Sequence, residues 1–220
     1  MDLKAILFDF DGTLADTAPG IVLTMRRAFA AEGLTLPTES AVRQTIGLPL
    51  QEAIRLLGGL DEAAAARTTA TYRRFIPECE LTHITIFPEV AETLRALRAR
   101  SLRLAICTSR GRDSLESILG AHGLRDCFET AVTATDALPA KPAPDMVFAL
   151  LDRLEVSAGE ALVVGDTTYD IDMGARAGCP TCAVTYGNHS PAQLSTANPT
   201  FTISRFPALL GLCGINESTG

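Results

Sequence analysis

Residues 5–14 read AILFDFDGTL, an apolar run that ends in two aspartates and a Gly-Thr pair. The run Ala5–Phe8 is short and wholly apolar, which is typical of a strand buried in a parallel sheet. Asp9 and Asp11 lie at positions i and i+2, so an extended chain would place both carboxylates on one side. Because two converging carboxylates repel each other, we expect a hard cation such as Mg²⁺ to hold them together. Taken alone, the segment is also compatible with a strand-end turn rich in Asp and Gly.

More apolar runs of strand length follow the first, and helical patterns separate them. The helical segments include residues 89–100 and 144–154, each with a proline near its start, as suits the first turn of a helix. This alternation predicts an α/β fold with a Rossmann-like parallel sheet. The further strands are expected at 102–107, 130–133, 161–164, 182–185 and 201–203.

Residues 17–80 interrupt the alternation, because they contain no good strand candidate and their apolar residues recur at helical spacing. We therefore expect a small all-helical cap domain at 17–80. It would be inserted after the first strand into an α/β core formed by 1–16 and 81–220. An insert at this point would stand over the carboxyl ends of the strands, where open α/β sheets bind ligands.

Two further polar motifs directly follow predicted strands. Asp166 and Asp170 come after the strand at 161–164 and lie one helical turn apart, so both can face one point. Thr108 and Ser109 come after the strand at 102–107, where hydroxyls and the amides of a helix start can cradle a phosphate. The alternative interpretation is N-capping of a helix, by Asp166 in the first motif and by Thr108 or Ser109 in the second.

Lys141 lies in the segment Pro139-Ala-Lys-Pro142 and is one of only two lysines in the chain, against seventeen arginines. Its compact ammonium charge suits a phosphate neighbour. A solvated surface lysine is the alternative. Each of these motifs is weak by itself, and their combination at one edge of a sheet is far more specific.

Taken together, the motifs resemble those of the haloacid-dehalogenase-like hydrolase superfamily, and most of all its phosphoglycolate-phosphatase-like branch with a helical cap. The resemblance covers essentially the whole chain. The matching segments are FDFDGTLAD at 8–16, the Thr108-Ser109 pair, KPAPD at 141–145 and VGDTTYD at 164–170.

The resemblance implies a magnesium-dependent phosphatase that works through a covalent intermediate. Asp9 matches the nucleophile that forms an aspartyl-phosphate, and Asp11 matches the general acid and base. The resemblance further implies that the transferred phosphoryl group is held by Thr108, Ser109 and Lys141. It implies that Mg²⁺ is bound by the Asp9 carboxylate, the Asp11 carbonyl and Asp166, with Asp170 in support.

The expected substrate is a small phosphorylated metabolite, with 2-phosphoglycolate as the best single candidate. Between residues 17 and 80 there is neither lysine nor histidine, although relatives that cleave carbon–phosphorus bonds or isomerise sugar phosphates use such residues there. A sugar phosphomutase and a non-catalytic protein that binds a phosphorylated metabolite remain alternatives.

Residues that could select the substrate are harder to identify. Arg43 resembles a cap position near the substrate and could hold a carboxylate, although an exposed helix arginine is the alternative. Roles for Tyr72, Arg73 and Arg74 stay open, and His189 is expected to be an ordinary loop residue.

Composition narrows the class of protein. The net charge of −7 and the isoelectric point near 5.0 argue against a nucleic-acid partner. No run approaches the roughly 18 apolar residues of a membrane span.

The six scattered cysteines suit a reducing cytoplasm. The Cys179-Pro-Thr-Cys182 motif follows a helix and precedes a strand, the reverse of a redox motif, so we expect structural thiols. Monomer and homodimer are both compatible with the sequence.

Overall fold

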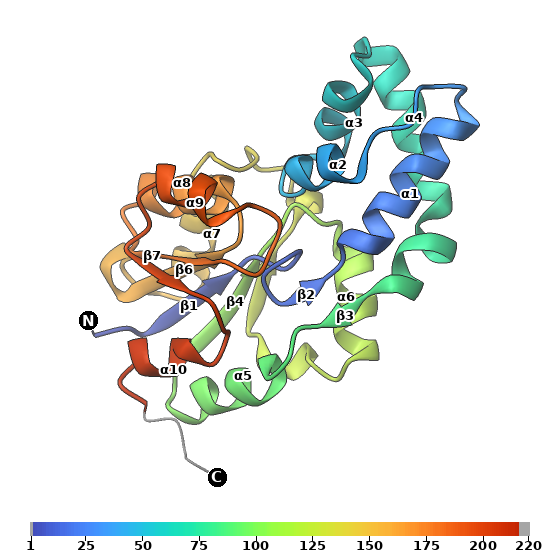
Figure 1. Ribbon diagram of the computed structural model, residues 1–220. Coiled ribbons are helices and arrows are strands. Elements are labelled where there is room, and N and C mark those ends of the chain that lie inside the picture. The colour runs from blue at the N-terminus through green and yellow to red at the C-terminus, as the bar shows by residue number, and fades with distance from the viewer. Residues whose placement is uncertain (1, 216–220) are drawn as a thin grey trace.

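The computed structural model describes residues 2–215, and the side chains of all of these except residues 80 and 81. Its core is a six-stranded parallel sheet with the order β5-β4-β1-β6-β7-β8 (Figure 1). The first strand therefore lies at the centre, between the fourth and the sixth. The strands are β1 (Ala5–Phe8), β4 (Arg103–Cys107), β5 (Thr130–Val132), β6 (Ala161–Gly165), β7 (Thr181–Val184) and β8 (Phe201–Ile203).

Helices cover both faces of this sheet, because alternate strand residues point to opposite sides. On one face, Ile6 and Phe8 of β1 pack with residues from α5 (Val90–Ala99), α6 (Arg112–Ala121) and α10 (Ala208–Leu212). On the other face, Leu7 packs with residues from α7 (Asp145–Arg153) and α8 (Thr168–Arg176). A further helix, α9 (Pro191–Thr196), lies beside α8. Burial on both faces explains why β1 at the centre is apolar throughout.

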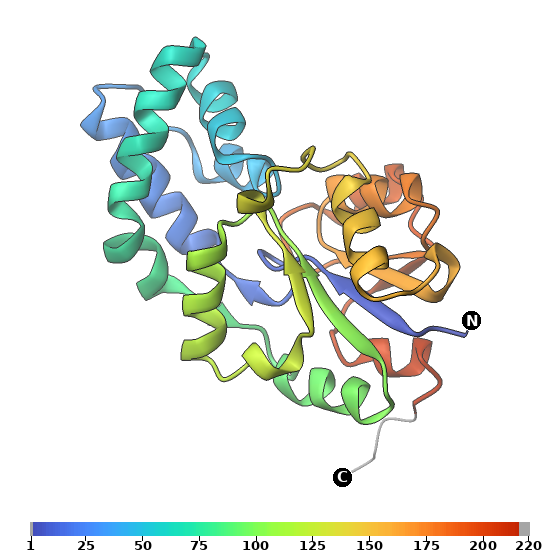
Figure 2. The ribbon, with the colours of Figure 1, turned by 180° about the vertical axis from the view of Figure 1, so that it is seen from behind.

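Four helices form a second layer with an apolar core of its own, in which Met25, Phe29, Ile54 and Tyr72 are buried. They stand together beyond the carboxyl ends of the strands in both views (Figures 1 and 2). The helices are α1 (Ala18–Ala31), α2 (Glu39–Thr45), α3 (Leu50–Gly58) and α4 (Glu62–Phe75), followed by a π-helical turn (Ile76–Glu80) and a 3₁₀ turn (Leu81–His83).

The chain enters and leaves this layer through a two-stranded antiparallel sheet of β2 (Ala15–Asp16) and β3 (Thr85–Ile86). Sequence patterns did not reveal this sheet, because two-residue strands are too short to show a period. The six core strands, by contrast, lie within one residue of their predicted bounds at each end. The predicted α/β fold with a Rossmann-like parallel sheet is confirmed.

Strand order decides which loops meet. Because β1 is hydrogen-bonded to both β4 and β6, the residues that follow these three strands emerge side by side at one edge. Among residues 2–215, no helix combines the length and the apolar character that crossing a membrane would require.

Candidate active site

Three buried aspartates form the centre of the site. Asp9 follows β1, Asp166 follows β6, and Asp170 lies in the first turn of α8. One carboxylate oxygen from each lies within 4.8 Å of one from each of the others, and all three residues are at most 5% exposed. The structure thus brings together the predicted nucleophile and the two acids of the 164–170 motif.

Lys141 lies inside this cluster. It comes from the loop between a 3₁₀ turn, η4 (Ala134–Asp136), and α7, and its ammonium group is fully buried. Its Nζ donates to Asp9 Oδ1 at 2.5 Å and to Asp170 Oδ1 at 2.7 Å. A solvated surface lysine is therefore excluded, and this ammonium group is the counter-charge of the acid cluster.

One ammonium group does not balance three buried carboxylates. Burial raises the pKa of Asp9 well above its usual value, although the charge of Lys141 opposes this. Burial, and then the charge of Asp170, raises the pKa of Asp166 to about 7. Burial acts to lower the pKa of Lys141, but the charges of Asp170 and Asp9 outweigh it, and the pKa is raised. The residues therefore fit a divalent cation, and their hard oxygen donors favour an ion such as Mg²⁺.

Asp166 is held by donors that come from distant parts of the chain. Its Oδ2 accepts from the Asn188 main-chain N–H at 2.6 Å and from Asn188 Nδ2 at 2.9 Å, and its Oδ1 accepts from Thr13 Oγ1 at 3.2 Å. Gly12 makes the close approach possible: its φ is +94°, and a Cβ there would lie 2.2 Å from Asp166 Oδ2. A larger residue at this turn would displace the carboxylate.

Asp170 is oriented by a capping box at the start of α8. Its Oδ2 accepts from the Thr167 main-chain N–H at 3.0 Å and from Thr167 Oγ1 at 2.6 Å. Its Oδ1 remains directed at Lys141. Because Thr167 is the N-cap of α8, the alternative in which Asp166 caps this helix is wrong, and Asp166 belongs to the acid cluster.

Asp11 is placed differently from the expectation that one cation holds both carboxylates of the first motif. Its carboxylate lies against Arg110, with Nε at 3.1 Å from Oδ1 and 3.2 Å from Oδ2, and it is not part of the acid cluster. The reason is local, because residues 10–15 form a tight turn and are not extended. The Asp11 main-chain carbonyl accepts from Asn188 Nδ2 at 3.3 Å and so lies near Asp166.

The two hydroxyls of the Thr108-Ser109 pair have separate partners. Thr108 is fully buried, and its Oγ1 accepts from the main-chain N–H of Arg110 at 3.1 Å. Ser109 Oγ donates to the carbonyl of Gly47, in the loop between α2 and α3, at 2.6 Å. Ser109 therefore joins the sheet edge to the helical layer.

The last turn of α2 in the helical layer contacts the core at a second point. Tyr169 OH contacts the Gln44 carbonyl at 3.5 Å, and Gln193 Nε2 donates to the Gln44 side chain.

His189 is 5% exposed and its Nδ1 accepts from the Thr168 N–H at 3.1 Å. It is thus a buried residue at the site's rim, and burial lowers its pKa.

Arg43 lies apart from the acids. Its Nε donates to Glu39 Oε1 at 3.0 Å, one turn away on α2, and among the described side chains no hydrogen bond or ion pair joins it to the acid cluster. Tyr72 is buried in the helical layer, whereas Arg73 and Arg74 are exposed on α4. Sequence patterns gave no site role to Arg110 or Asn188, although Arg110 directly follows the Thr108-Ser109 pair; Asn188 lies in the loop between β7 and α9.

The Cys179–Cys182 motif carries no redox signature. Both residues are free thiols, buried at 6% and 0% exposure, and burial raises their pKa values to about 11 and about 12. A thiol with a raised pKa is a poor nucleophile near neutral pH. The interpretation as structural thiols agrees with this environment.

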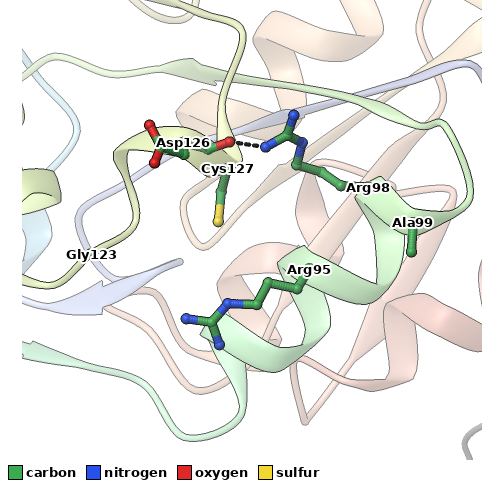
Figure 3. A pocket seen from close by; sticks show the side chains of 6 residues that line it. All are labelled: Arg95, Arg98, Ala99, Gly123, Asp126 and Cys127. Atoms are coloured by element: carbon green, nitrogen blue, oxygen red, sulfur yellow. Dashed lines mark hydrogen bonds between the residues drawn. The ribbon is translucent and has the colours of Figure 1, made fainter.

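A hollow elsewhere in the molecule is unrelated to the acid cluster. It is lined by Arg95, Arg98 and Ala99 of α5 and by Gly123, Asp126 and Cys127 before β5 (Figure 3). Arg98 donates to the main-chain carbonyl of Asp126 across it. These segments precede β4 and β5, so the hollow lies at the amino edge of the sheet, whereas Asp9 and Asp166 follow β1 and β6 at the carboxyl edge. Figure 1 shows α5 at the end of the sheet that faces away from the helical layer.

Known proteins are similar to this chain in sequence and in fold. The profile of the haloacid dehalogenase-like hydrolases matches residues 6–184. A phosphoglycolate phosphatase of Pectobacterium atrosepticum is 30% identical, over 98% of this chain and 94% of its own. The pyrophosphatase PpaX of Oceanobacillus iheyensis is 29% identical, over 97% of this chain and 98% of its own. A crystal structure of a haloacid dehalogenase-like hydrolase from Bacteroides fragilis superposes with a TM-score of 0.90 at 29% identity, covering 94% of this chain and 99% of that one. With the family profile spanning most of the chain, this protein belongs to the haloacid dehalogenase-like hydrolases.

Proposed function

We propose that the protein is a cytoplasmic phosphatase that hydrolyses a small phosphate monoester through an aspartyl-phosphate on Asp9. The observation that carries the proposal is the buried cluster of Asp9, Asp166 and Asp170 with Lys141 between them. A buried, acid-rich cluster with one ammonium group suits a dianionic phosphoryl group accompanied by a divalent cation. Relatives named phosphatases support the same reaction class.

In the first step, an Asp9 carboxylate oxygen attacks phosphorus in line with the ester bond. The Asp9 O–P bond forms while the bond from phosphorus to the leaving oxygen breaks, and Asp11 gives its proton to that oxygen. Lys141, which holds Asp9 Oδ1 at 2.5 Å, restricts the nucleophile to one orientation and neutralises charge on the phosphoryl oxygens.

In the second step, water attacks the same phosphorus and the bond to Asp9 breaks. Asp11 takes a proton from that water, so both carboxyl groups return to their starting state when phosphate leaves. Thr108 follows β4 at the same edge of the sheet and supplies a hydroxyl at the proposed phosphoryl position. Two moderate barriers replace one very high barrier, since uncatalysed monoester hydrolysis is among the slowest reactions known.

We propose Mg²⁺ as the cation of this site. Its ligands would be the carboxylates of Asp9 and Asp166 and the carbonyl of Asp11, with Asp170 in support. When bound, the ion supplies positive charge that offsets the carboxylates and polarises the phosphoryl group.

The helical layer at 17–80 is proposed to act as a cap domain over the α/β core formed by 1–16 and 81–220. Its Gln44 and Gly47 already rest on the core through Ser109, Tyr169 and Gln193. Such a cap would exclude bulk water during the first step and limit substrate size. Arg43 on α2 remains our candidate for recognising a substrate carboxylate, as 2-phosphoglycolate would present.

A substrate panel tests the proposal. Purified protein with Mg²⁺ is expected to release phosphate from 2-phosphoglycolate, and the panel should include sugar phosphates and pyrophosphate because one relative is a pyrophosphatase. Asp9→Asn is expected to abolish release and to retain phosphate binding. A panel without any phosphate release would reject the enzyme and leave a binding protein. Isomerisation driven by an added bisphosphate, without net release, would instead indicate a phosphomutase.

A further inference from the structure

Arg110 is a buried arginine of the site that the proposed chemistry does not yet use. It directly follows Ser109 after β4, and its guanidinium group reaches Asp11. Nε donates to Oδ1 at 3.1 Å and to Oδ2 at 3.2 Å, and Nη2 donates to Oδ1. The side chains of Arg110 and Asp11 are only 5% and 13% exposed. Charge-assisted hydrogen bonds between partly buried groups are strong and directional.

The guanidinium group is itself held from several directions. Its Nη1 donates to Ser114 Oγ on α6 at 2.8 Å, and its Cζ lies 5.9 Å from the centre of the Phe10 ring. The Arg110 main chain is tied to Thr108 Oγ1 at 3.1 Å and to the Ala134 N–H at 3.0 Å. Arg110 is thus a preorganised support for the Asp11 carboxyl group.

We propose that Arg110 is a positioning residue that acts through Asp11 by orienting the carboxyl group that exchanges protons with the leaving group. Two N–H groups of Arg110 donate to Oδ1, whereas within the described part of the chain Oδ2 accepts only from Nε, at 3.2 Å. Oδ2 is therefore the oxygen left to carry the transferred proton. This proton moves from Oδ2 to the leaving oxygen as the phosphorus–oxygen bond breaks, and water returns a proton in the second step. The inference rests on the proposed function.

The leaving group distinguishes this role from a general structural one. An alkoxide such as that of ethyl phosphate is a poor leaving group and needs a proton as it departs. The nitrophenolate of p-nitrophenyl phosphate departs readily without one. A residue that acts only through the proton donor should therefore matter for the first ester and hardly for the second. The ratio kcat/KM includes the steps up to departure of the leaving group, so the later hydrolysis of the intermediate does not obscure the comparison.

The test compares both esters in the Mg²⁺-loaded full chain. Arg110→Gln is expected to lower kcat/KM for ethyl phosphate by about 100-fold and for p-nitrophenyl phosphate by less than about threefold. The quantity to compare is kcat/KM for ethyl phosphate divided by kcat/KM for p-nitrophenyl phosphate. This ratio should be intermediate in Arg110→Lys, because lysine keeps the charge and loses the planar fork. Arg112→Gln is the matched control: Arg112 lies in the same segment and bonds to Asp136 at 2.8 Å, and its ratio should equal that of the wild type.

Equal losses on both esters would overturn the inference. So would a larger rise in KM for 2-phosphoglycolate than for ethyl phosphate, since Arg110 would then bind the substrate carboxylate. If Arg110→Gln does not fold by circular dichroism, the ratio in Arg110→Lys decides, and an unchanged ratio there refutes the role. A wild-type protein that hydrolyses neither ester would overturn the proposed function and this inference with it, whereas the other outcomes overturn the inference alone.

Discussion

The charge imbalance of the acid cluster predicts that the metal-free protein loses stability as the pH rises. Burial, then the charge of Asp170, raises the pKa of Asp166 from 3.8 to about 7. A carboxyl group with a raised pKa in the folded state binds its proton more tightly there. Its contribution to stability is fully present below the unfolded pKa and is lost as the pH rises through the folded pKa. The free energy of unfolding of the metal-free protein therefore falls between about pH 4 and about pH 7.

The size of the effect follows from the same pKa. Between about pH 5 and about pH 8, this one group lowers the free energy of unfolding by about 2–3 kcal/mol. For a chain of this length, that corresponds to a thermal midpoint lower by about 5–10 °C. A divalent cation offsets the charge of the carboxylates, so Mg²⁺ should raise the midpoint more at the higher pH than at the lower.

The assay is thermal unfolding in chelator and in saturating Mg²⁺ at both pH values. Asp166→Asn should remove most of the fall of the thermal midpoint with pH and most of the stabilisation by Mg²⁺. Asp152→Asn, on the exposed side of α7, is the control and should behave as the wild type. His189, whose pKa burial lowers, works in the opposite direction, but it is common to all variants and cancels in the comparison. The reasoning would be refuted if the wild-type midpoint in chelator stayed level or rose between the lower and the higher pH. It would also be refuted if the midpoint of Asp166→Asn fell as much as that of the wild type.

Three further substitutions probe separate parts of the site. Gly12→Ala forces a Cβ to 2.2 Å from Asp166 Oδ2 at a φ of +94°, so denaturant unfolding should show a loss of about 2–4 kcal/mol together with weaker Mg²⁺ stabilisation. Lys141→Met leaves two buried carboxylates without their partner, and it should abolish phosphate release and cost about 3–5 kcal/mol in chelator; activity close to the wild type would contradict the proposed role. Ser109→Ala removes the hydrogen bond to the Gly47 carbonyl and should lower kcat/KM about fivefold with little change in the thermal midpoint, and an unchanged kcat/KM would show that this contact does not matter for turnover.

Local sequence was sufficient to predict the six core strands and the acids that follow two of them. The run Ala5–Phe8 was readable because a strand buried on both faces is apolar throughout, and the other core strands were readable as short, mainly apolar runs. Asp9 and Asp166 stood out because charged residues directly after such strands need a partner. These features depend on residue type and short spacing, and both are visible in one dimension.

Only the tertiary structure decided which groups meet. The pairing of β1 with β4 and β6 carries Asp9 to Asp166 and Asp170, and the loop before α7 brings Lys141 between them. The tight turn after β1 directs the Asp11 carboxylate to Arg110 and away from the cluster, against the expectation from i, i+2 spacing. Periodicity describes one element at a time, whereas the contacts of Arg110 with Asp11 and of Lys141 with Asp9 join residues about one hundred or more positions apart. Only the packing of the whole chain sets the distances between them.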